Sequence, residues 1–226
     1  LHISPPGIGT NFKIDEYYEP TKDVVTKAKE IIKNYPENGH ILIFHSGVGE
    51  ITKTVTALNS LSDIPENTIA IPFHSQVDKG LAKIISDNDK MIPIKDFGTI
   101  PVISQITIDR RKIMLPKGNN YGDRDDKQYK RLIIVATNIA EASITIPNLR
   151  YVIDTGSQKT DMYDFRKRGN VLKSSGISES SRVQRKGRVG RRYDGTVFYL
   201  YEKNSMINNK TEYEISTSNL FLELFG

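Results

Sequence analysis

The stretch "VATNIAEASITIPNLRYVIDTG", Val135 to Gly156, indicates the fold. It starts within one apolar run, "RLIIVAT", crosses a turn rich in Thr, Asn and Ser, and ends in a second apolar run, "YVIDTG". Continuous apolar runs of this length are typical of parallel strands that are buried on both faces. In such sheets ligands bind beside the carboxyl ends of the strands, where Thr137 and Asn138 lie. The turn is therefore a candidate phosphate-binding loop, although an ordinary capped strand–loop–helix connection would look the same.

The rest of the chain repeats this alternation. A helical period over residues 21–35 is followed by the strand-like run "HILIF", and Ile51, Val55 and Leu58 mark a second amphipathic helix. Further strands are predicted at "TIAIPF" and "GTVFYLY", with a helix over 77–85. Strands that alternate with helices predict an α/β, three-layer sandwich with a mainly parallel central sheet.

Three segments depart from this scheme. Residues 1–20 carry Pro5–Pro6 and no sustained period, which favours a linker or an edge segment. Residues 86–130 are predicted to be an insertion, with a local hairpin around "PVISQITIDRRKIML", residues 101–115. Residues 157–177 are predicted to form a projecting β-hairpin that turns at "RGN", residues 168–170.

Composition excludes several classes of protein. Lys and Arg exceed Asp and Glu by 32 to 27, so a polyanionic partner is permitted but not required. The absence of cysteine excludes disulfides, thiolate metal sites and a cysteine nucleophile, and four scattered histidines argue against a zinc site. No apolar run reaches the roughly 18 residues of a membrane span, and no signal-peptide core opens the chain. We therefore expect an intracellular protein, of the cytoplasm or nucleus, without a membrane partner.

Positive charge is concentrated in "SRVQRKGRVGRR", Ser181 to Arg192, which has six cations and no acid. Ser181 and Gln184 fit a capping box, so a helix is predicted to begin at Ser181. On that helix Gln184, Arg188 and Arg191 would share one face. Two guanidinium groups and an amide suit a triphosphate, because arginine offers permanent charge and bidentate donors. The spacing alone leaves open a solvated basic face or a nuclear-import patch.

The same stretch contains two glycines. On the predicted helix, Arg182, Arg185 and Arg192 would lie on a different side from the triphosphate face. Gly187 and Gly190 would each cost about 1 kcal/mol relative to alanine. Such a cost suggests close approach of the backbone to a ligand.

Three stretches together carry a specific resemblance. They resemble motifs IV, V and VI of DEAH/DExH-type superfamily 2 RNA helicases. In this order they are "ILIFHSGVGEI", the Val135–Gly156 stretch quoted first above, and "QRKGRVGR". "LHISPPGIGTNFKIDEYY" resembles the segment that joins the two RecA-like domains, and "YEISTSNLFLELFG" the entry to the following domain. The resemblance implies a second RecA-like, helicase C-terminal domain over 21–212, with 213–226 starting the next domain. The form "QRKGRVGR" is closer to viral, poxvirus-like members, which would extend the expected location to a viral factory or virion.

The resemblance also implies roles for individual residues. Gln184, Arg188 and Arg191 match the catalytic residues that contact the γ-phosphate region, the two arginines as arginine fingers that neutralise charge on the transferred phosphoryl group. Ser143 and Thr145 match positions that line the nucleotide. The positions that match residues gripping the nucleic-acid backbone are Ser46, Gly47, His74, Ser75, Thr137 and Asn138. The 157–177 hairpin matches a β-hairpin that abuts the RNA base stack in this family.

Two positions depart from the family pattern. Pro147 stands where many relatives have an aspartate that reaches the ribose, and Ile85 aligns with a phenylalanine that stacks on the base. The loss of both contacts predicts loose nucleotide selectivity.

Two family motifs are absent from the sequence: the phosphate loop G-x-x-x-x-G-K-[ST] and the D-E-x-H quartet that holds Mg²⁺. In the family both belong to the first RecA-like domain. We therefore expect a monomeric NTP-dependent RNA helicase in which the first domain, on the same polypeptide, holds ATP or another NTP with Mg²⁺. RNA, or alternatively DNA, is the expected partner, this chain is expected to hold no metal, and alone it is expected to be inactive. The alternatives are a non-catalytic nucleic-acid-binding module and a translocase that remodels protein–RNA complexes without unwinding.

Overall fold

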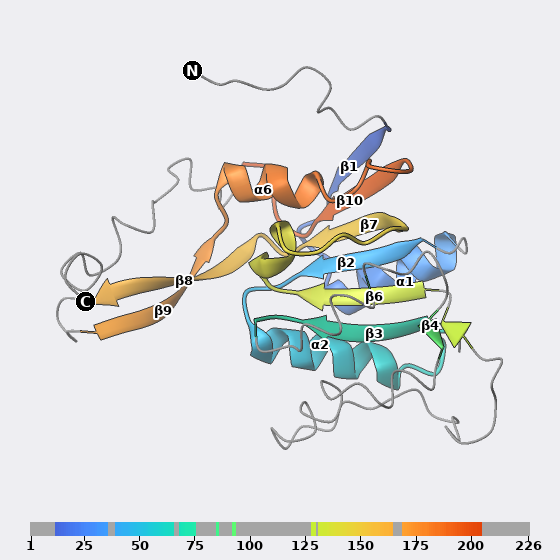
Figure 1. Cartoon of the computed structure of the whole chain (residues 1–226), viewed down its shortest axis with the longest axis horizontal. Coiled ribbons are helices and arrows are strands. Elements are labelled where there is room, and N and C mark those ends of the chain that lie inside the picture. The colour runs from blue at the N-terminus through green and yellow to red at the C-terminus, as the bar shows by residue number, and fades with distance from the viewer. Residues whose placement is uncertain are drawn as a thin grey trace.

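A computed structural model of the chain describes residues 12–35, 39–65, 68–75, 85, 92–93, 128–129, 131–164 and 169–204. Its central sheet has six strands in the order β1-β10-β7-β2-β6-β3, and every pairing is parallel (Figure 1). The strands are β1 (Ile14–Tyr18), β2 (His40–Phe44), β3 (Thr68–Phe73), β6 (Arg131–Ala136), β7 (Leu149–Asp154) and β10 (Gly195–Tyr199). The helices are α1 (Val24–Asn34), α2 (Val48–Ser60), the short 3₁₀ helix η1 (Asn138–Glu141) and α6 (Glu179–Lys186).

The sheet is covered on both faces, as the continuous apolar runs predict. Along β2, Ile41 and Ile43 pack into one core cluster with α1 and α2, whereas Leu42 and Phe44 pack into the other. This second cluster contains residues of η1, of the 144–149 connection and of the segment that follows α6. Successive side chains of a strand point to opposite faces, so a strand at the centre of three layers is apolar at every position. The predicted α/β sandwich is confirmed.

Local sequence explains where the two long helices begin. Asp23 caps α1 by accepting a hydrogen bond from the Thr26 amide at 3.0 Å, and α1 ends two residues before Pro36. The N-cap of α2 is Gly47, which has no side chain to cap the helix. The first amides of α2 therefore remain available at the carboxyl end of β2.

The segment predicted as a linker or edge contains the edge strand of the sheet. Residues 14–18 form β1, which pairs with β10, so the sheet starts within residues 1–20. Of the predicted insertion, only β4 (Ile92–Pro93) and β5 (Gln128–Tyr129) are described, and they pair antiparallel. The expected hairpin at 101–115, all of the expected 77–85 helix except Ile85, and residues 213–226 lie outside the described residues.

The predicted hairpin is present, but its turn is displaced. β8 (Ser157–Asp164) and β9 (Gly169–Gly176) pair antiparallel and project beyond the carboxyl edge of the sheet (Figure 1). Asp164 is opposite Gly169, so Gly169 and Asn170 belong to β9, and the prediction of a turn at "RGN" is wrong. No helix in the described part of the chain is long and apolar enough to cross a bilayer.

The helix of the basic stretch starts and ends earlier than predicted. Its N-cap is Ser178, whose hydroxyl accepts from the Ser181 amide at 3.2 Å, and its last residue is Lys186. The prediction of a capping box at Ser181 is therefore wrong. Arg188 and Arg191 follow the helix, so they do not share a helical face with Gln184.

Candidate functional site

The helical half of the basic stretch is neutralised inside the domain. Arg185 is fully buried and donates to Glu141 of η1 at 2.8 Å and to Asp154 of β7 at 2.7 Å. Burial acts to lower the pKa of the Arg185 guanidinium, but the two carboxylates outweigh burial and raise it. Arg182 and Lys186 form ion pairs with Glu16 of β1. These cations therefore hold α6 against the sheet.

Arg188 and Arg191, which follow the helix, are not neutralised in this way. Arg188 donates from Nη1 to the Ile144 carbonyl at 2.8 Å, and Arg191 donates from Nε to the Gly187 carbonyl at 2.9 Å. In the described part of the chain neither forms an ion pair with a carboxylate. Arg188 is partly buried, and its Nε has no hydrogen-bond partner. Burial, and then the charge of Arg191, lower the pKa of Arg188. A bound anion would relieve this unfavourable placement.

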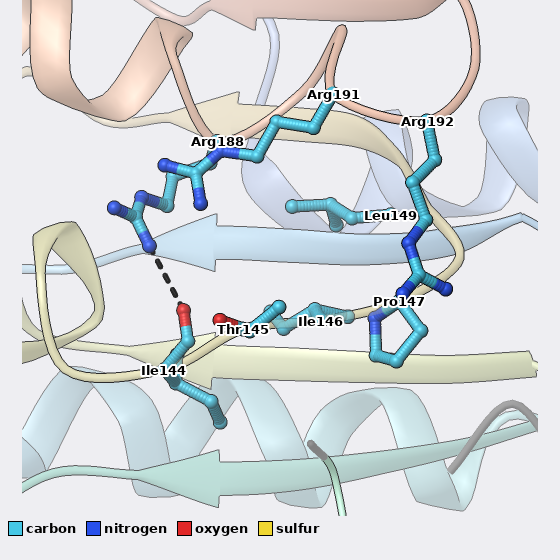
Figure 2. A pocket seen from close by; sticks show the side chains of 8 residues that line it. All are labelled: Ile144, Thr145, Ile146, Pro147, Leu149, Arg188, Arg191 and Arg192. Atoms are coloured by element: carbon cyan, nitrogen blue, oxygen red, sulfur yellow. Dashed lines mark hydrogen bonds between the residues drawn. The ribbon is translucent and has the colours of Figure 1, made fainter. Parts of the chain in front are cut away.

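Arg188 and Arg191 line a small pocket against the connection between η1 and β7 (Figure 2). Its lining residues are Ile144, Thr145, Ile146, Pro147, Leu149, Arg188, Arg191 and Arg192. Its volume is about 90 Å³. Pockets that enclose a small molecule usually measure roughly 300–1,000 Å³. This pocket can therefore contact only part of a nucleotide.

The pocket brings together three of the five residues predicted to contact nucleotide: Arg188, Arg191 and Thr145. Gln184 and Ser143 do not line it. The Ser143 hydroxyl donates back to the Ile139 carbonyl, which closes the turn of η1, and Gln184 is exposed on α6.

Gly190 has a backbone reason to be glycine. Its φ is +73°, in the left-handed region that glycine adopts without steric cost. Gly187, the C-cap of α6, has an ordinary φ of −66°. The prediction that both glycines admit a ligand gains no support from these conformations, because Gly190 turns the chain and Gly187 ends the helix.

Arg192 was missed by reasoning from the sequence. Projection onto one long helix placed it with Arg182 and Arg185, but it lines the pocket beside Pro147 (Figure 2). Gly190 could have indicated this position. A glycine often follows the end of a helix, and residues after that end no longer follow the helical spacing of side chains.

The residues predicted to grip nucleic acid lie at three neighbouring strand ends. Ser46 and Gly47 follow β2, whereas the other two pairs follow β6 and β3 and are Thr137–Asn138 and His74–Ser75. The strand order β2-β6-β3 places these turns in a row along the carboxyl edge (Figure 1). Backbone hydrogen bonds link the row, from the His45 amide to Ala136 and from the Thr137 amide to Phe73.

The groups in this row are mostly neutral donors. Ser75 and Asn138 are exposed, Ser46 and Thr137 are partly buried, and His74 is buried. Burial lowers the pKa of His74, so its imidazole is neutral at pH 7. A cation lies near the row, because a Cβ on Gly47 would come within 2.7 Å of the Lys159 ammonium nitrogen on β8.

The two positions that depart from the family pattern differ in location. Ile85 is 1% exposed and lies in a core cluster, so its side chain offers no surface to a base. Pro147 lines the pocket. No group of three or more metal-ligating side chains occurs within the described ranges.

Comparison with known proteins gives a consistent result. A family model described as "Helicase conserved C-terminal domain" matches residues 57–193. An Acanthamoeba polyphaga mimivirus protein, provisionally named ATP-dependent RNA helicase R366, is 34% identical over 97% of this chain and 12% of its own length. The ATP-dependent RNA helicase HrpA of Borreliella burgdorferi is 33% identical over 81% of this chain and 18% of its own length. The chain thus spans less than a fifth of either relative.

Solved structures show the same architecture. The Escherichia coli DExH-box NTPase HrpB is 25% identical, with a TM-score of 0.61 over 92% of this chain and 22% of that chain. A second HrpB structure gives a TM-score of 0.66 at 24% identity over 94% of this chain and 23% of that chain. The parallel sheet described above is therefore the RecA-like fold.

Proposed function

Because the chain belongs to the helicase conserved C-terminal domain family, of the DExH/DEAH type, we propose that it is the second motor domain of an ATP-dependent RNA helicase. In this proposal a nucleoside triphosphate is bound mainly by a first RecA-like domain of the same polypeptide. Arg188 and Arg191 reach its γ-phosphate from this side of the cleft. The relatives that carry helicase names support the proposal, as does a pocket too small for a whole nucleotide.

The observation that carries the proposal is a pair of guanidinium groups, those of Arg188 and Arg191, that line one pocket and have no paired carboxylate among the described residues. Among the described residues, Arg188 and Arg191 donate only to backbone carbonyls, so their remaining N–H groups can turn to phosphate oxygens. In phosphoryl transfer, charge develops on the transferred group, and preorganised arginine donors stabilise it. Thr145 adds a hydroxyl at the same pocket.

The lining of the pocket fits phosphate and not the metal. Mg²⁺ takes oxygen ligands, usually one or two carboxylates together with substrate phosphates. None of the eight lining residues is acidic. We therefore assign Mg²⁺ to the first domain, and the residues of this chain to the phosphate oxygens and the charge that develops on them.

We further propose that the row of turns at the carboxyl edge holds the nucleic-acid backbone. Hydroxyl, amide and main-chain donors at Ser46, Thr137 and Asn138 suit phosphate oxygens, and the free amides of α2 add a positive helix end. Contacts of this kind are independent of base sequence. Closure of the two domains on NTP and reopening after hydrolysis would then move this row along the strand.

Arginine substitutions test the catalytic role. In the full-length protein, Arg188→Ala and Arg191→Ala should abolish RNA-stimulated NTP hydrolysis while RNA affinity, measured by fluorescence anisotropy, changes by less than about threefold. The reverse pattern, retained hydrolysis with lost RNA affinity, would instead support the non-catalytic binding module.

Shortening the hairpin tests strand separation. Replacing residues 162–171 with a two-residue turn leaves the base of β8 and β9 in place. We propose that the hairpin separates the strands of a duplex. We therefore expect duplex unwinding to be lost while RNA-stimulated hydrolysis continues, because no hairpin residue lines the nucleotide pocket. Unchanged unwinding would show that the hairpin does not separate the strands. The wild-type protein could also displace a bound protein from RNA and yet fail to unwind a duplex. That result would favour the remodelling translocase.

A further inference from the structure

We propose that Arg192 is a third cationic contact of the nucleotide site and binds the α-phosphate, the end of the phosphate chain nearest the sugar. This inference rests on the proposed function, because it takes the γ-phosphate to lie at Arg188 and Arg191. It assigns a residue that the motif pattern leaves without a role.

The pocket is elongated along the connection that it follows, and it has cations at both ends. The lining follows the connection from Ile144 to Leu149. Figure 2 shows the guanidinium groups of Arg188 and Arg191 at the Ile144 end, whereas that of Arg192 lies beside Pro147. The cations thus occupy two ends of one pocket. A phosphate chain with its γ-phosphate at the first end extends toward the second.

The backbone that follows α6 presents these side chains. Arg191 and Arg192 are consecutive, and in a regular helix they would diverge by about 100° around the axis. They instead follow the left-handed Gly190, in a segment outside α6, and both reach the pocket.

The end of the pocket beside Pro147 has one kind of polar group, the Arg192 guanidinium. Ile146, Pro147 and Leu149 contribute apolar side chains there, and no lining residue has a carboxylate that could accept from a ribose hydroxyl. A guanidinium group only donates hydrogen bonds and stays charged at every physiological pH. The ligand group that fits this end is an anionic acceptor, and the α-phosphate is the anion that a nucleotide places next to its sugar.

The experiment compares nucleotide affinities in the full-length protein. Arg192→Ala should weaken binding of both ADP and a non-hydrolysable ATP analogue about tenfold, as expected for one charge-assisted contact. The KM for ATP should rise by the same factor, while kcat stays within twofold, because the α-phosphate keeps its charge during the reaction. Arg192→Lys should retain part of the affinity. Lys33→Ala, which removes an exposed cation from the last turn of α1, is the matched control and should change neither affinity.

Three results would overturn the inference. One is a loss of affinity for the ATP analogue with unchanged ADP affinity, which would place Arg192 at the γ-phosphate. The second is unchanged nucleotide affinity with weakened binding of single-stranded RNA, which would place Arg192 on the RNA. The third is no change in any of these. If Arg188→Ala abolishes hydrolysis in the same series, the proposed function survives each of these results. If Arg188→Ala hydrolyses normally, the proposed function itself fails.

Discussion

Arg185 and Arg188 are three residues apart in the chain, yet their guanidinium groups have opposite surroundings. Arg185 is fully buried between Glu141 and Asp154. Arg188 is partly buried, donates to a backbone carbonyl and lies near a second arginine. The pKa of Arg185 is raised and that of Arg188 is lowered. One basic stretch can therefore contain both an arginine paired with buried carboxylates and an arginine that donates to a backbone carbonyl.

The boundary between the two halves is the end of α6. Before Gly187, the helix presents its cations to carboxylates on η1, β7 and β1. After Gly187, the chain leaves those carboxylates and passes over the 144–149 connection, whose pocket-lining residues include no acid. Arg185 and Arg188 are the same residue type in the same basic stretch, so their positions relative to Gly187 account for their different surroundings.

The largest expected effect is on NTP hydrolysis and concerns the part of the basic stretch that follows Gly187, which we call the open half. Arg188→Ala should lower kcat for NTP hydrolysis by at least about 10³-fold, the range for an arginine finger, which corresponds to roughly 4 kcal/mol of transition-state stabilisation. Arg188→Lys should also be defective, because an ammonium group lacks the planar fork of donors. Steady-state NTPase assays of the full-length protein measure both. A loss below tenfold would show that the open half does not serve catalysis.

The next largest effect is on stability and concerns the helical half of the basic stretch. Arg185→Met should lower the opening free energy of β7 and α6 by about 3–5 kcal/mol, because it leaves two buried carboxylates without their partner. Amide hydrogen exchange in the full-length protein measures this opening. Arg182→Met is the comparison; it removes ion pairs with Glu16 and Glu179, whose side chains are more exposed than Glu141 and Asp154, and each pair should contribute about 1 kcal/mol or less. Equal effects of the two substitutions would show that the burial of the Arg185 pairs does not make them stronger than the partly exposed pairs of Arg182.

Much of the fold could be predicted from the sequence, because it depends on local signals. The runs that form β2, β3, β6 and β7 are apolar at nearly every position, which only strands buried on both faces require. The polar residues after them follow from the same reading. Parallel strands end at one edge, so Ser46, Thr137 and Ser75 had to lie near one another.

The two halves of the basic stretch could not be separated in the same way. Ser178, Ser180 and Ser181 can all cap a helix, and local sequence gives no means to choose among them. The partners of Arg185 are 44 and 31 residues away, so no local pattern reveals that this arginine is buried. The pairing is a property of the packed sheet, which brings η1 and β7 under α6.

Lowering the pH should reduce the stability of the fold, while the arginines in both halves of the basic stretch stay charged. His40, partly buried at the start of β2, and His45, buried just past its end, have pKa values lowered by desolvation to about 4. Below the unfolded pKa of about 6.5 the unfolded chain takes up protons that the folded chain refuses, so stability falls between pH 6.5 and 4. At pH 5 the loss is about 2 kcal/mol per histidine. Urea unfolding at pH 7 and pH 5 measures it, and His40→Gln should remove about 2 kcal/mol of the difference. An unchanged difference would assign the pH dependence to other groups, such as His45 and His74.

The smallest effect concerns the glycines that separate the halves. Gly190→Ala should cost about 1–2 kcal/mol, because a Cβ disfavours its φ of +73°. Gly187→Ala should cost less, since its φ is ordinary and the cost comes only from a tight contact of its Cβ, 3.3 Å from the Val183 carbonyl oxygen. Because Gly190 precedes Arg191 and Arg192, its substitution should also raise the KM for ATP, whereas Gly187→Ala should not. Thermal unfolding and NTPase assays test the pair. If Gly187→Ala proves the more harmful, the end of the helix, and not the left-handed turn, holds the open half in place.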